Sequence, residues 1–124
     1  KKGDKEGRAA VSQLIADAHF SLVPKGQGNG REAMRAAQEA VTAYRELGNR
    51  HQEATSLNLM ANAQLMSQAN SDALKTARQA QKMFQELGDG RGQAGALLLA
   101  AGAHLGEGEF AESKDVAKDA REIF

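Results

Sequence analysis

Apolar residues recur along this chain three and four positions apart, the spacing that places side chains on one face of an α-helix. Small residues continue the same spacing in the stretch that follows each apolar run. The clearest examples are Leu57, Met60, Ala61 and Leu65, then Ala73, Ala77 and Ala80, and again, forty positions after the first set, Leu97, Ala100, Ala101 and Leu105. The pattern predicts pairs of amphipathic helices, each with a first helix (A) and a second helix (B).

The helix pair is repeated three times in the same register. Each unit has an alanine near its start, small residues in its second half and a large aromatic residue at its end. The equivalent positions are Ala9, Ala54 and Ala94; Ala33, Ala73 and Ser113; Ala37, Ala77 and Ala117; Ala40, Ala80 and Ala120; and Tyr44, Phe84 and Phe124. We therefore predict one domain over residues 1–124, divided into repeats at 3–47, 48–87 and 88–124. The first repeat carries a loop insertion at 23–30.

The segments "ELGN" and "ELGD" mark the seams between repeats. Gly48 and Gly88 suit the left-handed position that ends a helix, and Asn49 and Asp89 suit the N-cap that begins the next one. Asp4 is the corresponding cap before the first A helix. A phosphate-binding glycine loop is the rival interpretation. It would need a preceding strand and a Gly-Lys-Ser/Thr ending, and the sequence has neither.

Composition agrees with an all-α domain, because helix-forming residues dominate and aromatic residues are scarce. Sixteen basic residues balance sixteen acidic ones, so no positive excess favours nucleic acid or an anionic membrane. No apolar run reaches the ~20 residues of a membrane span. The chain has no cysteine, which suits the reducing cytoplasm. Since it begins at Lys1 without methionine, we expect a fragment of a larger protein.

These residues resemble the tetratricopeptide (TPR) repeat family, in its variety of about forty residues. The third unit carries the resemblance most fully, with small and apolar residues at the signature positions of both helices and "GEF" at 108–110 similar to the family's Gly-x-Phe/Tyr turn. The matching residues are Leu97, Ala100, Ala101 and His104 in helix A, and Ala117 and Ala120 in helix B. HEAT-type pairs are a rival, but the Gly-Asp seam and paired small residues favour the tetratricopeptide pattern. The resemblance implies three stacked antiparallel helix pairs, an α-solenoid with right-handed superhelical twist.

The resemblance also implies a concave groove, lined by the A helices, that binds a peptide or a helix. The residues implied on its wall are Gln13, Asp17, Asn58, Asn62, Leu65 and Leu98. Asn58 and Asn62 lie four residues apart, hence on one helix face, and their amides offer donors and acceptors to a peptide backbone. The third unit has Gly95, Gly102 and Gly106 instead of larger side chains, which predicts a smooth groove wall there.

Candidate catalytic or metal-binding chemistry is weak. His19 and His104 lie at equivalent positions of A helices two units apart, roughly 18 Å at ordinary helix spacing, too far to share a metal. We expect both to be packing residues and His51 to be a surface residue. The acidic residues between Glu107 and Asp115 fit a solvated turn. We therefore predict no catalytic residue, no metal and no cofactor.

The function predicted from the sequence is a protein–protein interaction scaffold, with no enzymatic activity and no binding of nucleic acid or membrane. The alternative is a structural spacer or self-association module, which could pair through the uncapped C-terminal end at Phe124. The glycine-rich loop at 23–30 can be read as a tolerated insertion or as a binding loop, and the sequence leaves this open.

Overall fold

The computed structural model describes residues 6–11, 13–14 and 30–123, and every regular element in this part of the chain is an α-helix. Residues 6–11 and 13–14 are helical and are called the N-terminal helix below. The helices that follow are α2 (Gly30–Leu47), α3 (Arg50–Met66), α4 (Asn70–Leu87), α5 (Gly90–Gly106) and α6 (Phe110–Ile123). The predicted cap Asp4, the loop at 23–30 apart from Gly30, and Phe124 lie outside the described residues. The all-α prediction is confirmed.

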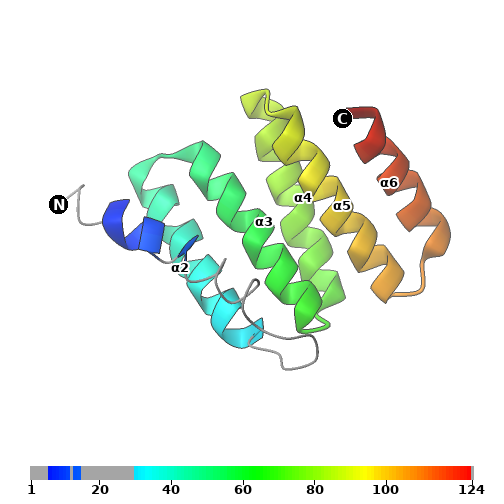
Figure 1. The fold of residues 1–124 in the computed structure, drawn as a ribbon, viewed down its shortest axis with the longest axis horizontal. Helices are drawn as coiled ribbons and strands as arrows, with labels where there is room; N and C mark the ends of the chain where they lie inside the picture. The colour runs from blue at the N-terminus through cyan, green and yellow to red at the C-terminus, as the bar shows by residue number, and fades with distance from the viewer. Residues whose placement is uncertain (1–5, 12, 15–29, 124) are drawn as a thin grey trace.

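The helices form a row in chain order, and each packs against the next one (Figure 1). Connections of two or three residues join them, which suits antiparallel neighbours. Among α2–α6, the backbones of α3 and α5 also approach each other, whereas those of α2 and α4, and of α4 and α6, lie farther apart. The A helices α3 and α5 are therefore neighbours, while the backbones of the B helices α2, α4 and α6 are separated.

The seams between helix pairs have the predicted geometry. Gly48 and Gly88 both adopt a left-handed conformation with φ of 73°. Immediately afterwards, the side chain of Asn49 accepts a hydrogen bond from the backbone of Gln52 (3.2 Å), and Asp89 accepts one from Gly92 (3.0 Å). Each glycine ends one helix and each Asn or Asp caps the next. The recurring Gly-Asn and Gly-Asp pairs therefore connect consecutive helices.

Small residues fill the core where helices cross, as the repeat pattern predicts. The positions equivalent to Ala33 and Ala40 are buried in all three B helices, with Ser113 in place of alanine in α6. Phe84, at the end of α4, is also buried and lies against Gly92 of α5. A methyl group on Gly92 would overlap the phenyl ring, so the aromatic residue and the glycine fit together as a pair.

The turns inside the second and third helix pairs differ at one residue. Gly108 in the α5–α6 turn has φ of 77°, and Gln68, forty positions earlier in the α3–α4 turn, has φ of 60°. Left-handed backbone costs a residue with a Cβ about 1–2 kcal/mol, whereas glycine adopts it freely. The α3–α4 turn, with the sequence "QAN" at 68–70, therefore begins with the same left-handed backbone as the "GEF" turn and is strained.

We predict that Gln68→Gly stabilises the protein by about 1 kcal/mol, because it removes this strain. For a chain of this size the melting temperature should rise by roughly 3–5 °C. The converse substitution, Gly108→Gln, should lower it by a similar amount. Thermal unfolding followed by circular dichroism would measure both variants. Equal melting temperatures for wild type and Gln68→Gly would show that the turn stores no such strain.

Candidate functional site

The A-helix surface formed by the N-terminal helix, α3 and α5 contains the predicted groove residues that the structure describes. Gln13 is half-buried and donates a hydrogen bond from Nε2 to Oγ of Ser56 on α3 (3.3 Å). Asn58, Asn62 and Leu65 are half-buried on α3, and Leu98 is exposed on α5. Asp17 lies outside the described residues. The predicted residues thus come from successive A helices that contact each other.

Asn58 has the most distinctive environment of this set. Its side chain lies beside Gly95 of α5, since a Cβ built on that glycine would be 3.6 Å from Nδ2 of Asn58. The other amide atom, Oδ1, is buried and has no hydrogen-bond partner among the described residues. A buried acceptor without a partner costs about 1–3 kcal/mol unless a ligand or water donates to it. The Asn58 amide therefore combines a close approach to α5 with a buried oxygen that lacks a partner among the described residues.

A shallow hollow lies at the C-terminal ends of α3 and α5. Its lining combines one of the predicted groove residues with glycine and amide groups: Leu65, Gln68, Asn70, Gly102 and Gly106. Gly102 and Gly106 were predicted to form a smooth wall, but the structure shows another role for them. Leu65 lies against Gly102 and the Asn70 amide against Gly106, so these glycines let side chains of the preceding helix pair pack closely. Sequence reasoning did not anticipate Gln68 or Asn70 in this region, and no sequence pattern marks either of them.

Two further buried polar atoms without a partner belong to the A helices α3 and α5. Oε1 of Gln64 and Nδ1 of His104 have no hydrogen-bond partner among the described residues, and the two residues are equivalent positions of α3 and α5. Nδ1 of His104 lies 3.6 Å from Oε1 of Glu109, too long for a good hydrogen bond. His104 is buried, as expected of a packing histidine.

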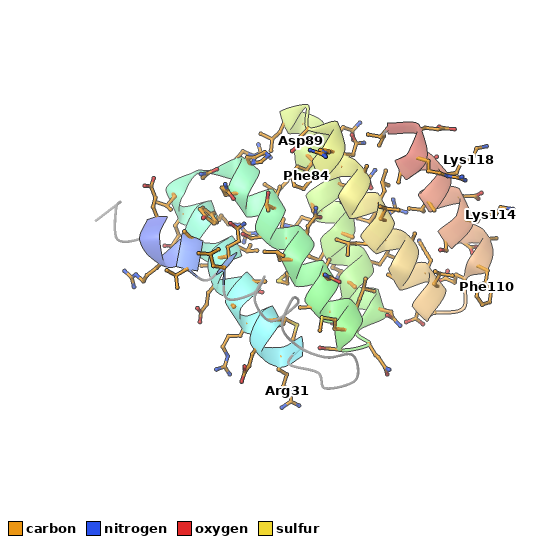
Figure 2. The ribbon with its side chains drawn as sticks, in the orientation of Figure 1. Arg31, Phe84, Asp89, Phe110, Lys114 and Lys118 are labelled. Atoms are coloured by element: carbon orange, nitrogen blue, oxygen red, sulfur yellow. The ribbon has the colours of Figure 1, made fainter. Side chains whose placement is uncertain are left out.

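A hydrogen bond between His51 and Asp89 joins the second and third helix pairs. Nε2 of His51, at the start of α3, donates to Oδ2 of Asp89 at 2.9 Å. The His51 ring also meets the edge of Phe84 at a centroid distance of 5.9 Å and an interplanar angle of 81°. Figure 2 shows Phe84 and Asp89 together at one end of α4 and α5. His51 is exposed, as expected of a surface residue, and it also links two helix pairs through Asp89, which the sequence did not predict.

The electrostatics of this cluster follow from its hydrogen bonds. The hydrogen bond from the Gly92 backbone, followed by the one from His51, lowers the pKa of the Asp89 carboxyl below its ordinary value. Both contacts are explained by helix capping and repeat packing. Within the described ranges, no three His, Cys, Asp or Glu residues come together as a potential metal site. Glu107, Glu109, Glu112 and Asp115 are all exposed around the last turn.

Comparison with known proteins gives no assignment, since no family model matches the chain and no curated protein is significantly similar to it. None of the described helices combines the length and apolarity required to cross a membrane.

The Asp89 contacts predict a pH dependence of stability. Because the folded pKa is lower than the ordinary value of about 3.9, the ionised carboxylate stabilises the folded state above pH ~4. That contribution should be lost as the pH falls through the folded pKa. Asp89→Asn can still cap the helix, as Asn49 does, but cannot ionise. Urea unfolding from pH ~7 to ~3 should therefore show a smaller loss of stability for Asp89→Asn than for wild type.

His51→Ala separates the two causes. In the His51→Ala background, the proteins with and without the Asp89→Asn substitution should differ less in how much stability they lose at low pH. Part of the difference should remain, because the hydrogen bond from the Gly92 backbone is still present. Parallel pH profiles for wild type and Asp89→Asn would contradict the assignment of this acid sensitivity to Asp89.

Proposed function

We propose that this chain is a protein-interaction module of the tetratricopeptide type, which binds a peptide or a helix in a concave groove lined by its A helices. The proposed architecture is a right-handed α-solenoid of three helix pairs. Its support is the spacing of the helices, since the backbones of α3 and α5 approach each other while those of the B helices lie farther apart. When the A helices are closer together than the B helices, the row of helices is expected to curve, with the A helices on its concave side.

The observation that carries the proposed binding role is that Asn58 places a half-buried amide on the face of α3 that lies beside Gly95 of α5. An amide side chain can both donate hydrogen bonds to a peptide backbone and accept them from it. Asn62 lies one turn further along α3 and is also half-buried. Two amides on one face can together hold consecutive backbone groups of an extended or helical segment.

The chemistry around these amides favours an uncharged guest segment. The predicted wall residues described on α3 and α5 are Asn58, Asn62, Leu65 and Leu98, and none of them is charged. The neighbouring glycines of α5 add no side-chain charge either. Apolar contact and backbone hydrogen bonding would therefore supply the affinity, and no bond would be made or broken. In this proposal the module acts in the cytoplasm as part of a larger protein.

A structural spacer or self-association module is the second candidate. It rests on the exposed apolar residues at the two ends of the helix row rather than on the groove. The two candidates involve different surfaces, so substitutions can separate them.

The groove is tested with the variant Asn58→Ala/Asn62→Ala. Losing a buried hydrogen bond to a guest costs about 1–3 kcal/mol, so binding should weaken by roughly tenfold or more. Stability should be unchanged or higher, because alanine favours the helix and removes the unpaired acceptor. Proteins captured from source-cell lysate by the wild-type chain would be compared by quantitative mass spectrometry with those captured by the variant, and direct titration would follow.

Gln79→Ala/Gln85→Ala is the matched control, because it also removes two amides, from exposed positions of the B helix α4. The control should retain every captured protein. If the groove variant also retains them at wild-type strength, the proposed role of Asn58 and Asn62 is wrong.

A further inference from the structure

The hollow at the C-terminal ends of α3 and α5 combines an apolar wall with a polar rim. Leu65 forms the wall, and its side chain lies against Gly102, where a Cβ atom would be only 3.2 Å away. Gln68 and Asn70 supply the rim, and Gly106 completes the lining. None of these residues is charged, and only Leu65 carries a large apolar side chain. The hollow therefore suits a ligand that is apolar along its stem and polar at its tip.

The amide of Asn70 presents its edge at this site. A Cβ atom built on Gly106 would be 2.5 Å from Nδ2, 2.6 Å from Cγ and 2.6 Å from Oδ1 of Asn70. Because these distances are nearly equal, the flat amide lies face-on against the backbone of Gly106. Its oxygen and nitrogen are then at the edge, where a ligand in the hollow can reach them. A larger residue than glycine at position 106 would displace the amide from this place.

Gln68 keeps its place on the rim at an energetic cost. Its backbone is left-handed, with φ of 60°, whereas the equivalent residue of the next turn is Gly108. Glycine at position 68 would remove the strain, but it would also remove the side chain that lines the hollow. Strained residues of this kind cluster at ligand-binding sites. A strained residue that also lines a hollow therefore indicates a binding role for its side chain.

The electrostatic surroundings of the hollow favour a cation. α3 and α5 run in the same direction (Figure 1), and both end at the hollow, so the negative ends of two helix dipoles meet there. The last turn of α3 has no basic residue, and that of α5 has only His104, which is buried. Of the Asp, Glu, Lys and Arg residues, the two nearest in sequence to the lining are Asp72 and Glu107, both acidic.

We propose that this hollow binds a lysine or arginine side chain of a partner protein. The aliphatic stem packs along Leu65 and Gly102, as the stems of these side chains do on other apolar surfaces. The charged head donates hydrogen bonds to the amide oxygens of Gln68 and Asn70, at the negative ends of α3 and α5. A neutral apolar side chain would fill the same space without using the rim.

The basic side chain belongs to the guest segment of the groove, and on this point the inference rests on the proposed function. Leu65 follows Asn62 by three residues on α3, so the hollow lies just beyond the amides, where the A helices end. The part of the guest held by Asn58 and Asn62 is uncharged, and its basic residue comes at the end that reaches the hollow. A test with small probes does not need the guest, so the hollow and the groove can fail separately.

The test titrates the chain with blocked amino acids and follows its amide signals by two-dimensional ¹H–¹⁵N NMR. The probe is Nα-acetyl-lysine N-methylamide, and the matched control is the norleucine compound, which has an aliphatic stem and no charge. The lysine probe should shift the backbone signals of Gln68, Gly102 and Gly106 and the side-chain amide signal of Asn70 in a saturable manner. The norleucine probe should bind about fivefold more weakly, because it gains nothing from the helix ends.

Exchanging the charge at position 68 tests the rim. Gln68→Glu should strengthen binding of the lysine probe about two- to fivefold, the effect of an exposed ion pair, and Gln68→Lys should abolish it by repulsion. The same two exchanges at Gln79, an exposed residue of α4 outside the lining, control for the net charge and should leave binding unchanged. Gln68→Gly should weaken binding while it raises the melting temperature, because the amide and the strain are removed together.

Equal binding of the lysine and norleucine probes would overturn the proposal, since the hollow would then recognise only the stem. So would unchanged lysine binding by Gln68→Lys, or a titration in which the signals of the hollow do not move. The dispersion of the NMR spectrum shows that each variant is folded.

Asn58→Ala/Asn62→Ala separates this site from the groove, because it should bind the lysine probe like wild type. If it does so and also retains every captured protein, the groove role is wrong and the hollow remains a site for basic side chains. If the lysine probe does not bind wild type but capture depends on the two asparagines, the groove role holds and the present proposal is wrong.

Discussion

The close approach of α3 and α5 is the constraint on which the rest of the structure depends. Two helices whose backbones come this near cannot both carry large side chains along the contact. Here α5 supplies the space: Gly95 and Gly102 accommodate Asn58 and Leu65 of α3, and Gly92 accommodates the ring of Phe84 from α4. The A helices can therefore touch while α4 is held against both of them. At Gly92 even a methyl group would overlap the Phe84 ring, so a larger residue there would push α4 and α5 apart.

Polar residues at the seams fix the angle between neighbouring helix pairs, whereas the small residues only allow the helices to pack closely. Gly88 turns the chain, Asp89 caps α5, and His51 bonds to that cap from the start of α3. Arg50 adds an ion pair to Glu86 of α4 at 2.9 Å, and Arg45 of α2 meets the buried Glu53 of α3 at the same distance. The exposed Arg50–Glu86 pair contributes little energy, but the Asp89 network connects three helices at one point. A few directional polar contacts at the seams therefore determine how neighbouring helix pairs are oriented. The small residues of the core permit close packing but do not by themselves select one orientation.

The repeat pattern was sufficient to predict the helices, the seams and most of the core. Gly48, Gly88, Asn49 and Asp89 were identifiable because each has a backbone role that few other residue types can fill. The link from His51 to Asp89 was not identifiable, since it joins residues 38 positions apart and depends on how two repeats are rotated. The strained Gln68 was missed for a related reason: a degenerate turn sequence gives no sign that its backbone follows the glycine turn forty positions later.

The same limit applies to the candidate site. Periodicity and family resemblance assigned Asn58 to one surface of α3, but only the packed structure shows that one of its amide atoms faces Gly95 while the other is buried without a partner. Likewise, the sequence identified Gly102 and Gly106 as small without indicating that Leu65 and Asn70 occupy the space beside them. Side-chain contacts between repeats depend on how one helix pair is rotated relative to the next, and the sequence pattern carries no information on that rotation.

Equivalent positions of α3 and α5 carry side chains of different chemistry. Position 58 of α3 is a half-buried amide that lies beside Gly95 of α5. The equivalent residue of α5, Leu98, offers only apolar area and is exposed, as are Leu105 and Phe110. Hydrogen bonds require a defined geometry, whereas apolar contact is governed by shape and area. Under the proposed binding role, α3 would therefore supply the directional contacts to a guest segment, and α5 would supply apolar area.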